Sequence, residues 1–169
     1  MTSFLWEVPG PKSGAARWIA GGWQVNGILT VSAGRPFNVV SGTDRALTGA
    51  GTQRPNLVGN PRLDTGRSKD DLLRQYFNPA AFALPATGAF GNSGRNTMVG
   101  PGSYNLDSSM FKMLPVTERI KVQFRAEFFN TLNHANLGQP VANIGAPQVG
   151  RIQAASAPRI LQFGLRLTY

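Results

Sequence analysis

The residues that could carry out chemistry are few and far apart. His134 is the only histidine and cysteine is absent, so a thiolate site is excluded and a metal site would have no second imidazole. The glycines at 88, 91 and 94 form a GxxGxxG run, but no Gly-Lys-Ser/Thr follows it, and no strand-to-helix context surrounds it. The adjacent acids Asp70 and Asp71 suit the start of a helix, where they interact with its dipole, better than a cation site. The sequence therefore predicts no enzyme, no metal site and no cofactor.

Composition narrows the class of protein. Charged residues make up 15% of the 169-residue chain, which also contains 20 Gly and 12 Pro. No apolar run is long enough for a transmembrane helix, but barrel strands escape this test because half of each strand is polar. The net charge is +9. The arginines are spread along the chain, whereas nucleic-acid binders concentrate basic residues in a stripe or motif, so we expect no nucleic-acid partner.

The last nine residues, 161–169, alternate between apolar and polar or small side chains. A period of two is the pattern of a β-strand with two chemically different faces. About ten residues of such alternation span the hydrocarbon of an outer-membrane barrel, and aromatic rings gather at its interfaces. The apolar row, which includes Phe163, Leu165, Leu167 and Tyr169, would then face lipid. The alternative is a strand of a soluble sandwich.

Alternation recurs upstream and predicts about six strands: 3–8, 23–33, 104–112, 119–129, 149–154 and 161–169. In 119–129 the polar row carries Lys121, Arg125 and Glu127, which are costly inside a protein but tolerable beside an aqueous lumen. We expect these charges to face the lumen and to lie close enough to neutralise one another. The same segment also repeats apolar residues every four positions, as a helix does. Strand is the preferred interpretation, because the valine and phenylalanine residues favour it.

Residues 41–103 change character and are rich in Gly, Pro, Asn, Asp and Arg. One short segment has helical signals, since Ser68 and Asp71 form a capping-box pattern and Pro79 ends the segment. The remainder is predicted to be loop, as is 130–147. Such long loops are uncommon in compact soluble domains, whereas outer-membrane barrels combine short periplasmic turns with long extracellular loops. The patterns predict an all-β fold: an incomplete, antiparallel, up-and-down transmembrane β-barrel segment, with 41–103 as its long extracellular loop.

Several short stretches, in order along most of the chain beyond residue 20, resemble the carboxy-terminal part of TonB-dependent receptors. The likeness is to the Oar-like branch, whose precursors often begin with a carboxypeptidase-regulatory-like domain. No single stretch is diagnostic, but the ordered set is specific. The stretches are GWQVNGI at 22–28, SAGRPF at 32–37, YFNPAAF at 76–82, FGNSGRN at 90–96, GPG at 100–102, FRAEFFN at 124–130, NH at 133–134 and PRILQFGL at 158–165.

This resemblance implies a transporter in the outer membrane of a Gram-negative cell, with a barrel of about 22 strands plugged by an amino-terminal domain. It implies uptake of a scarce solute, energised by the TonB complex through amino-terminal parts outside this chain. The implied partners are outer-membrane lipid, the rest of the barrel with its plug, and the barrel assembly machinery. The terminal strand, with Phe163, Leu165, Leu167 and Tyr169, would resemble the signal that this machinery accepts by edge pairing.

The chain departs from that plan in size. About six strands cannot close a barrel, whose smallest members have about eight, and open edges in lipid leave unpaired backbone groups that cost several kcal/mol each. The amino terminus lacks the basic and apolar regions of a secretory signal. We therefore expect a fragment of a receptor that does not transport alone. Whether Met1 is a true start, and which solute is carried, stay open. The alternative is a soluble β-rich binding or structural domain that uses 41–103 for contacts.

Overall fold

The computed structural model describes residues 1–11, 13–50, 52–64, 66–117 and 119–169. The chain divides into two compact units, which we call the sheet unit and the loop unit. The sheet unit comprises residues 1–32, 103–136 and 157–169, and the loop unit comprises residues 33–102 and 137–156. Within the described residues, no helix has the length and apolarity needed to cross a membrane.

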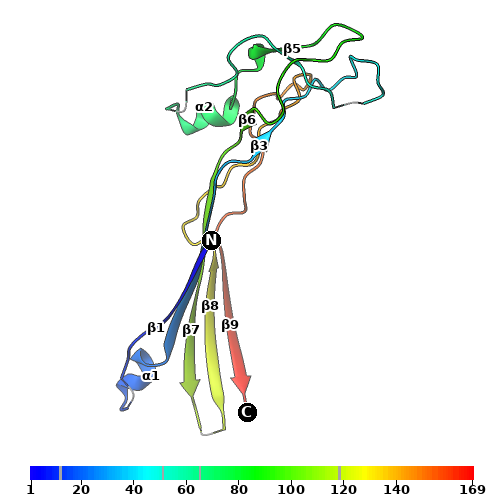
Figure 1. Cartoon of the computed structure of the whole chain (residues 1–169). Coiled ribbons are helices and arrows are strands. Elements are labelled where there is room, and N and C mark those ends of the chain that lie inside the picture. The colour runs from blue at the N-terminus through cyan, green and yellow to red at the C-terminus, as the bar shows by residue number, and fades with distance from the viewer. Residues whose placement is uncertain (12, 51, 65, 118) are drawn as a thin grey trace. The chain divides into compact units, whose positions relative to one another are not determined.

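The sheet unit is built on five strands that pair in the order β1-β2-β7-β8-β9 and lie side by side in Figure 1. Every neighbouring pair is antiparallel. The strands are β1 (Thr2–Glu7), β2 (Trp23–Ser32), β7 (Ser103–Pro115), β8 (Lys121–Phe129) and β9 (Ile160–Thr168). The predicted all-β, antiparallel, up-and-down fold is confirmed, although these strands form an open sheet rather than a closed barrel.

The strand interpretation of 119–129 is confirmed, because β8 pairs with β7 on one side and with β9 on the other. A short turn joins β7 to β8. In it the Val116 N–H donates to the Ile120 carbonyl at 2.9 Å, and Thr117 Oγ1 accepts from the Ile120 N–H at 2.9 Å. These bonds satisfy the backbone where the ladder ends.

The connection between β1 and β2 contains a short helix that the sequence did not indicate, α1 (Ala16–Ala20). No side chain caps its start, and five residues are too few for a helical apolar period. The helix closes when the Gly21 N–H donates to the Arg17 carbonyl at 3.0 Å. Gly22 then takes φ +72°, where a Cβ would lie 2.7 Å from the Met113 carbonyl oxygen, so only glycine fits at the entry to β2.

The predicted loop 41–103 is not structureless, because it shares a core with residues 137–156. Phe77 is fully buried, and its ring centre lies 6.0 Å from that of Phe37 and 5.9 Å from that of Phe82. The other core residues are also distant in sequence: Val39, Ala81, Met98, Ile144 and Val149. The short elements around them are β3 (Pro36–Phe37), which pairs with β6 (Met98–Val99), β4 (Asn56–Leu57), which pairs with β5 (Phe82–Ala83), the helix α2 (Lys69–Arg74) and the 3-10 turn η1 (Pro79–Ala81).

The predicted helix in this unit is confirmed as α2. Its cap is the expected one, since Ser68 Oγ accepts from the Asp71 N–H at 3.2 Å and donates to Asp71 Oδ2 at 2.6 Å. The helix ends at Arg74, several residues before Pro79.

The predicted strand at 149–154 is wrong. Its ladder contact within the described residues is a single bridge between Ile152 and Pro140. Gly150 takes φ +81°, and the Ile152 N–H donates to the Leu73 carbonyl at 2.9 Å. The backbone of this segment is therefore used inside the loop unit, and the sheet has five long strands instead of about six.

Candidate functional site

The strand register sorts the side chains of the sheet into two faces, because residues opposite one another in an antiparallel pair point to the same side. Following the pairs from β9 to β1 defines an apolar face, whose members include Leu161, Phe163, Leu165, Leu167, Val122, Phe124, Leu114, Met110, Val25, Leu29 and Trp6. The other side is a polar face, with Gln24, Asn26, Ser109, Gln123, Arg125, Glu127, Gln162 and Arg166.

Most of the apolar face is uncovered, and the part around Lys112 lies against α1. On β9, Phe163 is 64% exposed and Leu165 is 76% exposed, and all nine residues of the strand are exposed. The ring contact of Phe163 stays within the sheet: its centroid lies 6.3 Å from that of Phe124. Soluble sheets bury such a face under a second layer, so a continuous uncovered face indicates contact with an apolar environment.

The four predicted terminal residues lie together at one edge of the sheet. The register confirms that Phe163, Leu165 and Leu167 share the apolar face, while Tyr169 follows β9 and is 96% exposed. In the described sheet β9 pairs with β8 alone. Its outer edge therefore presents backbone N–H and C=O groups, which is the arrangement that accepts a further strand.

The predicted lumen charges share the polar face but do not pair. Arg125 Nε donates to Gln123 Oε1 at 2.9 Å, and its guanidinium carbon lies 5.2 Å from the centre of the Phe111 ring. Within the described residues, no ion pair joins Glu127 to Arg125 or to Lys121. The Arg125 guanidinium instead lies against a neighbouring amide and ring. The three charges therefore share one face without a direct ion pair among the described residues.

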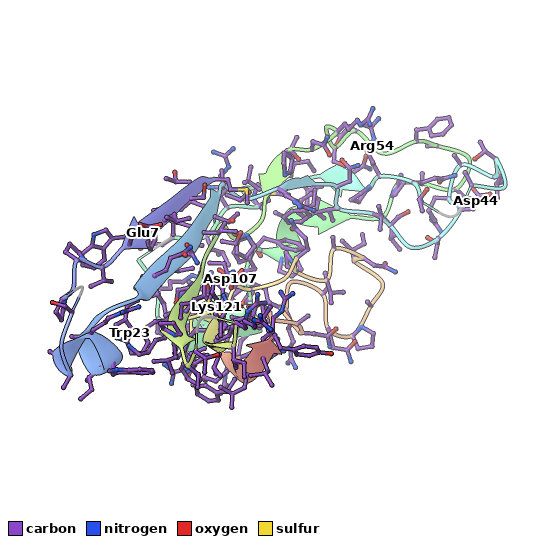
Figure 2. The ribbon with its side chains drawn as sticks, turned by 90° about the horizontal axis from the view of Figure 1, so that it is seen from below. Glu7, Trp23, Asp44, Arg54, Asp107 and Lys121 are labelled. Atoms are coloured by element: carbon purple, nitrogen blue, oxygen red, sulfur yellow. The ribbon has the colours of Figure 1, made fainter. Side chains whose placement is uncertain are left out.

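One cation, Lys112, lies on the apolar face, where it is only 7% exposed. Its Nζ donates to the carbonyl oxygens of Ile19 at 2.9 Å and Gly21 at 2.8 Å, and lies 4.5 Å from the centre of the Trp23 ring. The Trp23 Nε1–H also donates to the Ile19 carbonyl at 2.8 Å, and Figure 2 shows Trp23 beside α1. The carbonyls at the end of α1 and an aromatic face thus replace water around the ammonium group. A lysine in an apolar row was the sequence signal for this site.

The residue that sequence reasoning missed is Asn130, immediately after β8. It is 7% exposed and has φ +50°. Its Nδ2 donates to the carbonyls of His134 at 3.0 Å and Ala157 at 3.1 Å, and its Oδ1 accepts from the His134 N–H at 3.0 Å. One side chain thereby fastens the end of β8 to the segment that leads into β9.

Two further asparagines, Asn133 and Asn136, follow Asn130 at three-residue intervals, and their side chains also bond to distant backbone groups. Asn133 Oδ1 accepts from the Arg159 N–H at 3.0 Å, and Asn136 Oδ1 accepts from the Tyr104 N–H at 2.9 Å. Asparagine tolerates positive φ and bonds to nearby backbone, so the NxxNxxN spacing could have indicated this turn.

His134 stacks on Tyr104, with ring centroids 3.8 Å apart. Among the described residues, no group of three or more His, Cys, Asp or Glu side chains could hold a metal ion. The stacked rings pack His134 against β7 at the end of the sheet.

In the loop unit, Asp44 organises a polar turn, and Figure 2 labels its position. Its carboxylate accepts from the N–H groups of Thr48 at 3.1 Å and Gly49 at 2.6 Å, and from the Gln53 amide. Desolvation is the largest single influence and raises the pKa of Asp44. The hydrogen bonds from Thr48, Gly49, Gln53 and Leu47 together outweigh it and lower the pKa below its usual value.

An antiparallel sheet with an uncovered apolar face, a polar face and long connections has the properties of the wall of a membrane β-barrel. Comparison with protein families agrees: residues 1–162 match the outer membrane beta barrel domain, and the chain belongs to this family. The protein is therefore located in the outer membrane. No curated protein and no solved structure matches the chain. Family membership favours the membrane interpretation over the soluble β-rich domain.

Proposed function

We propose that the chain forms part of the barrel wall of a TonB-dependent receptor of the Oar-like branch, which takes up a scarce solute across the outer membrane. The observation that carries this proposal is the sheet itself, with an uncovered apolar face, a polar face, and unpaired outer edges on β1 and β9. The ordered stretches that resemble this receptor branch support the choice among outer-membrane barrels. The function is transport and not catalysis.

The strand order supports an orientation in the membrane. Residues 33–102 and 130–159 both connect strands at the same end of the sheet, whereas the connections 8–22 and 116–120 lie at the opposite end. Outer-membrane barrels have long extracellular loops and short periplasmic turns. The loop unit, including 41–103, is therefore extracellular, and Tyr169 lies at the periplasmic end.

The two faces meet different partners. Outer-membrane lipid contacts the apolar face, while Lys121, Arg125 and Glu127 face the lumen, where water and the plug lie. The edges of β1 and β9 pair with the remaining strands of the receptor, since unpaired backbone groups in hydrocarbon cost several kcal/mol each. TonB is reached only through amino-terminal parts of the receptor.

The barrel assembly machinery recognises the terminal strand by adding it to an open edge, as in β-augmentation. Phe163, Leu165, Leu167 and Tyr169 supply the aromatic and apolar row. Deleting Tyr169 from the intact receptor is expected to lower the folded amount in the outer membrane several-fold, measured by heat-modifiable mobility on gels. Unchanged insertion after deletion of Tyr169 would show that the residue only packs.

Transport is tested by deleting the receptor gene in its host and measuring which solutes remain in the spent medium. A second strain lacks TonB, and a third carries both deletions. The proposal expects the same solute to stay behind in all three strains. Depletion that requires the receptor gene but not TonB would contradict energised uptake and leave a passive barrel.

A further inference from the structure

The loop unit contains a cavity of about 550 Å³ beside α2. Small-molecule sites typically measure about 300–1,000 Å³ and have apolar walls with a few polar groups. Apolar residues form most of the wall, and two arginines and one aspartate stand at its border. The apolar lining residues used in the argument below are Leu72, Met98 and Leu137, and the charged ones are Arg62, Asp64 and Arg67.

The apolar wall is held in place before any ligand arrives. Met98 is 5% exposed and belongs to the core of the loop unit. Tyr76 lines the same wall, and its hydroxyl donates to the Val99 carbonyl at 3.1 Å. Burial raises the pKa of Tyr76, which keeps this donor protonated. A preformed site loses little conformational entropy when a ligand binds.

The charged border favours an anion. Arg67 Nε donates to the Asp64 carbonyl oxygen at 3.0 Å, and its Nη2 donates to the Gln75 carbonyl at 2.8 Å. These bonds fix the guanidinium without neutralising it, and further N–H donors remain. The Asp64 carboxylate accepts from the Gly66 N–H at 3.0 Å. Arg62 is exposed, and within the described residues its guanidinium makes no hydrogen bond or ion pair. Two positive charges against one negative charge leave a positive border around an apolar wall.

We propose that this cavity binds a small organic acid, with an apolar body of one or two rings against Leu72, Met98 and Leu137, and a carboxylate at Arg62 and Arg67. A cation of the same shape is repelled by the border, and a neutral analogue loses the charged contact. The site needs no energy source. It is therefore independent of TonB-dependent uptake and is tested separately from it.

The test uses the absence of native cysteine. In an intact receptor whose cysteines outside this chain have been replaced by serine, Leu137→Cys places one thiol in the cavity wall. The receptor is labelled in isolated outer membranes and then purified to measure its modification. Val58→Cys is the control, because Val58 is 62% exposed in the same unit and does not line the cavity. Each thiol is modified with an anionic sulfonatoethyl and a cationic trimethylammonioethyl methanethiosulfonate. The anion-to-cation rate ratio is expected to be about fivefold higher at Leu137→Cys than at the control, and equal ratios would overturn the proposal.

The second arm uses 2-naphthoate as the acid and 2-naphthylmethanol as its neutral analogue. Naphthoate is expected to slow modification of Leu137→Cys and not of Val58→Cys, with little effect of the alcohol. Adding Arg62→Gln is expected to weaken protection about tenfold, and adding Arg62→Lys to weaken it less, because a charged hydrogen bond supplies this discrimination. Equal protection by acid and alcohol, or no protection by either, would overturn the assignment.

Discussion

Asn130 is the residue at which the sheet unit can be tested most sharply. Its side chain makes three hydrogen bonds, all inside the turn between β8 and β9, and it holds a left-handed backbone at φ +50°. Asn130→Ala removes the three bonds and puts alanine, which lacks the local hydrogen bonds of asparagine, in the left-handed region. At about 0.5–1.5 kcal/mol for each of the three neutral bonds, and about 1 kcal/mol for the backbone, the expected loss is about 2.5–5.5 kcal/mol of unfolding free energy.

Two variants separate the causes of this loss. Asn130→Gly also removes the side chain but accepts positive φ freely, so it is expected to be about 1 kcal/mol less destabilising than Asn130→Ala. Asn133→Ala is the matched control, because Asn133 has the same φ of +50°, is exposed, and accepts one bond, from the Arg159 N–H.

The assay is urea unfolding of the intact barrel refolded into lipid vesicles, followed by tryptophan fluorescence. Unfolding free energies of Asn130→Ala and Asn133→Ala are compared under identical conditions. Asn130→Ala is expected to lose at least about 1 kcal/mol more unfolding free energy than Asn133→Ala, because it breaks two more hydrogen bonds. Equal losses would refute the view that Asn130 fastens β8 to β9.

The remaining predictions concern a cation and a carboxylate. Lys112→Met removes two charged hydrogen bonds and the cation beside Trp23, while the thioether fills part of the same buried space. A net loss of about 1–3 kcal/mol is expected in the same unfolding assay, and an unchanged urea midpoint would contradict it. Because hydrogen bonds hold the pKa of Asp44 below its usual 3.8, the carboxylate stabilises its turn above that pH and stops doing so as the pH falls through the lowered pKa. In the wild type, pepsin should therefore cut near Thr48 only at the most acidic pH. In the Asp44→Asn variant, it should cut there over the whole pH range in which pepsin is active. Identical cleavage profiles would remove Asp44 from this role.

Sequence reasoning found the sheet because each strand carries its own signal. Alternation along 161–169 needs no knowledge of any other segment, and the capping pattern at Ser68 and Asp71 is equally local. The loop unit could not be found this way. Phe37, Phe77 and Phe82 meet in a core only after distant segments have come together, and each has neighbours typical of loops.

The candidate sites likewise fall into those with a local sequence signal and those without one. The terminal row on β9 follows from a period of two, so its placement on one face was predictable. Lys112 was harder, because the carbonyls that receive it come from α1, a helix of five residues without a capping side chain. The cavity beside α2 combines residues 62–64, 67, 72, 76, 98, 99, 101 and 137, which no local pattern connects.

The central claim is that the apolar face of the sheet touches lipid and the polar face touches water. A single-cysteine scan from Leu161 to Leu167, with nitroxide labels in the intact receptor, measures it most directly. The account predicts that collisions with oxygen, which dissolves in lipid, peak at 161, 163, 165 and 167. Collisions with a water-soluble nickel chelate should peak at 162, 164 and 166. Uniform accessibility, or protection of both faces from both reagents, would contradict the account.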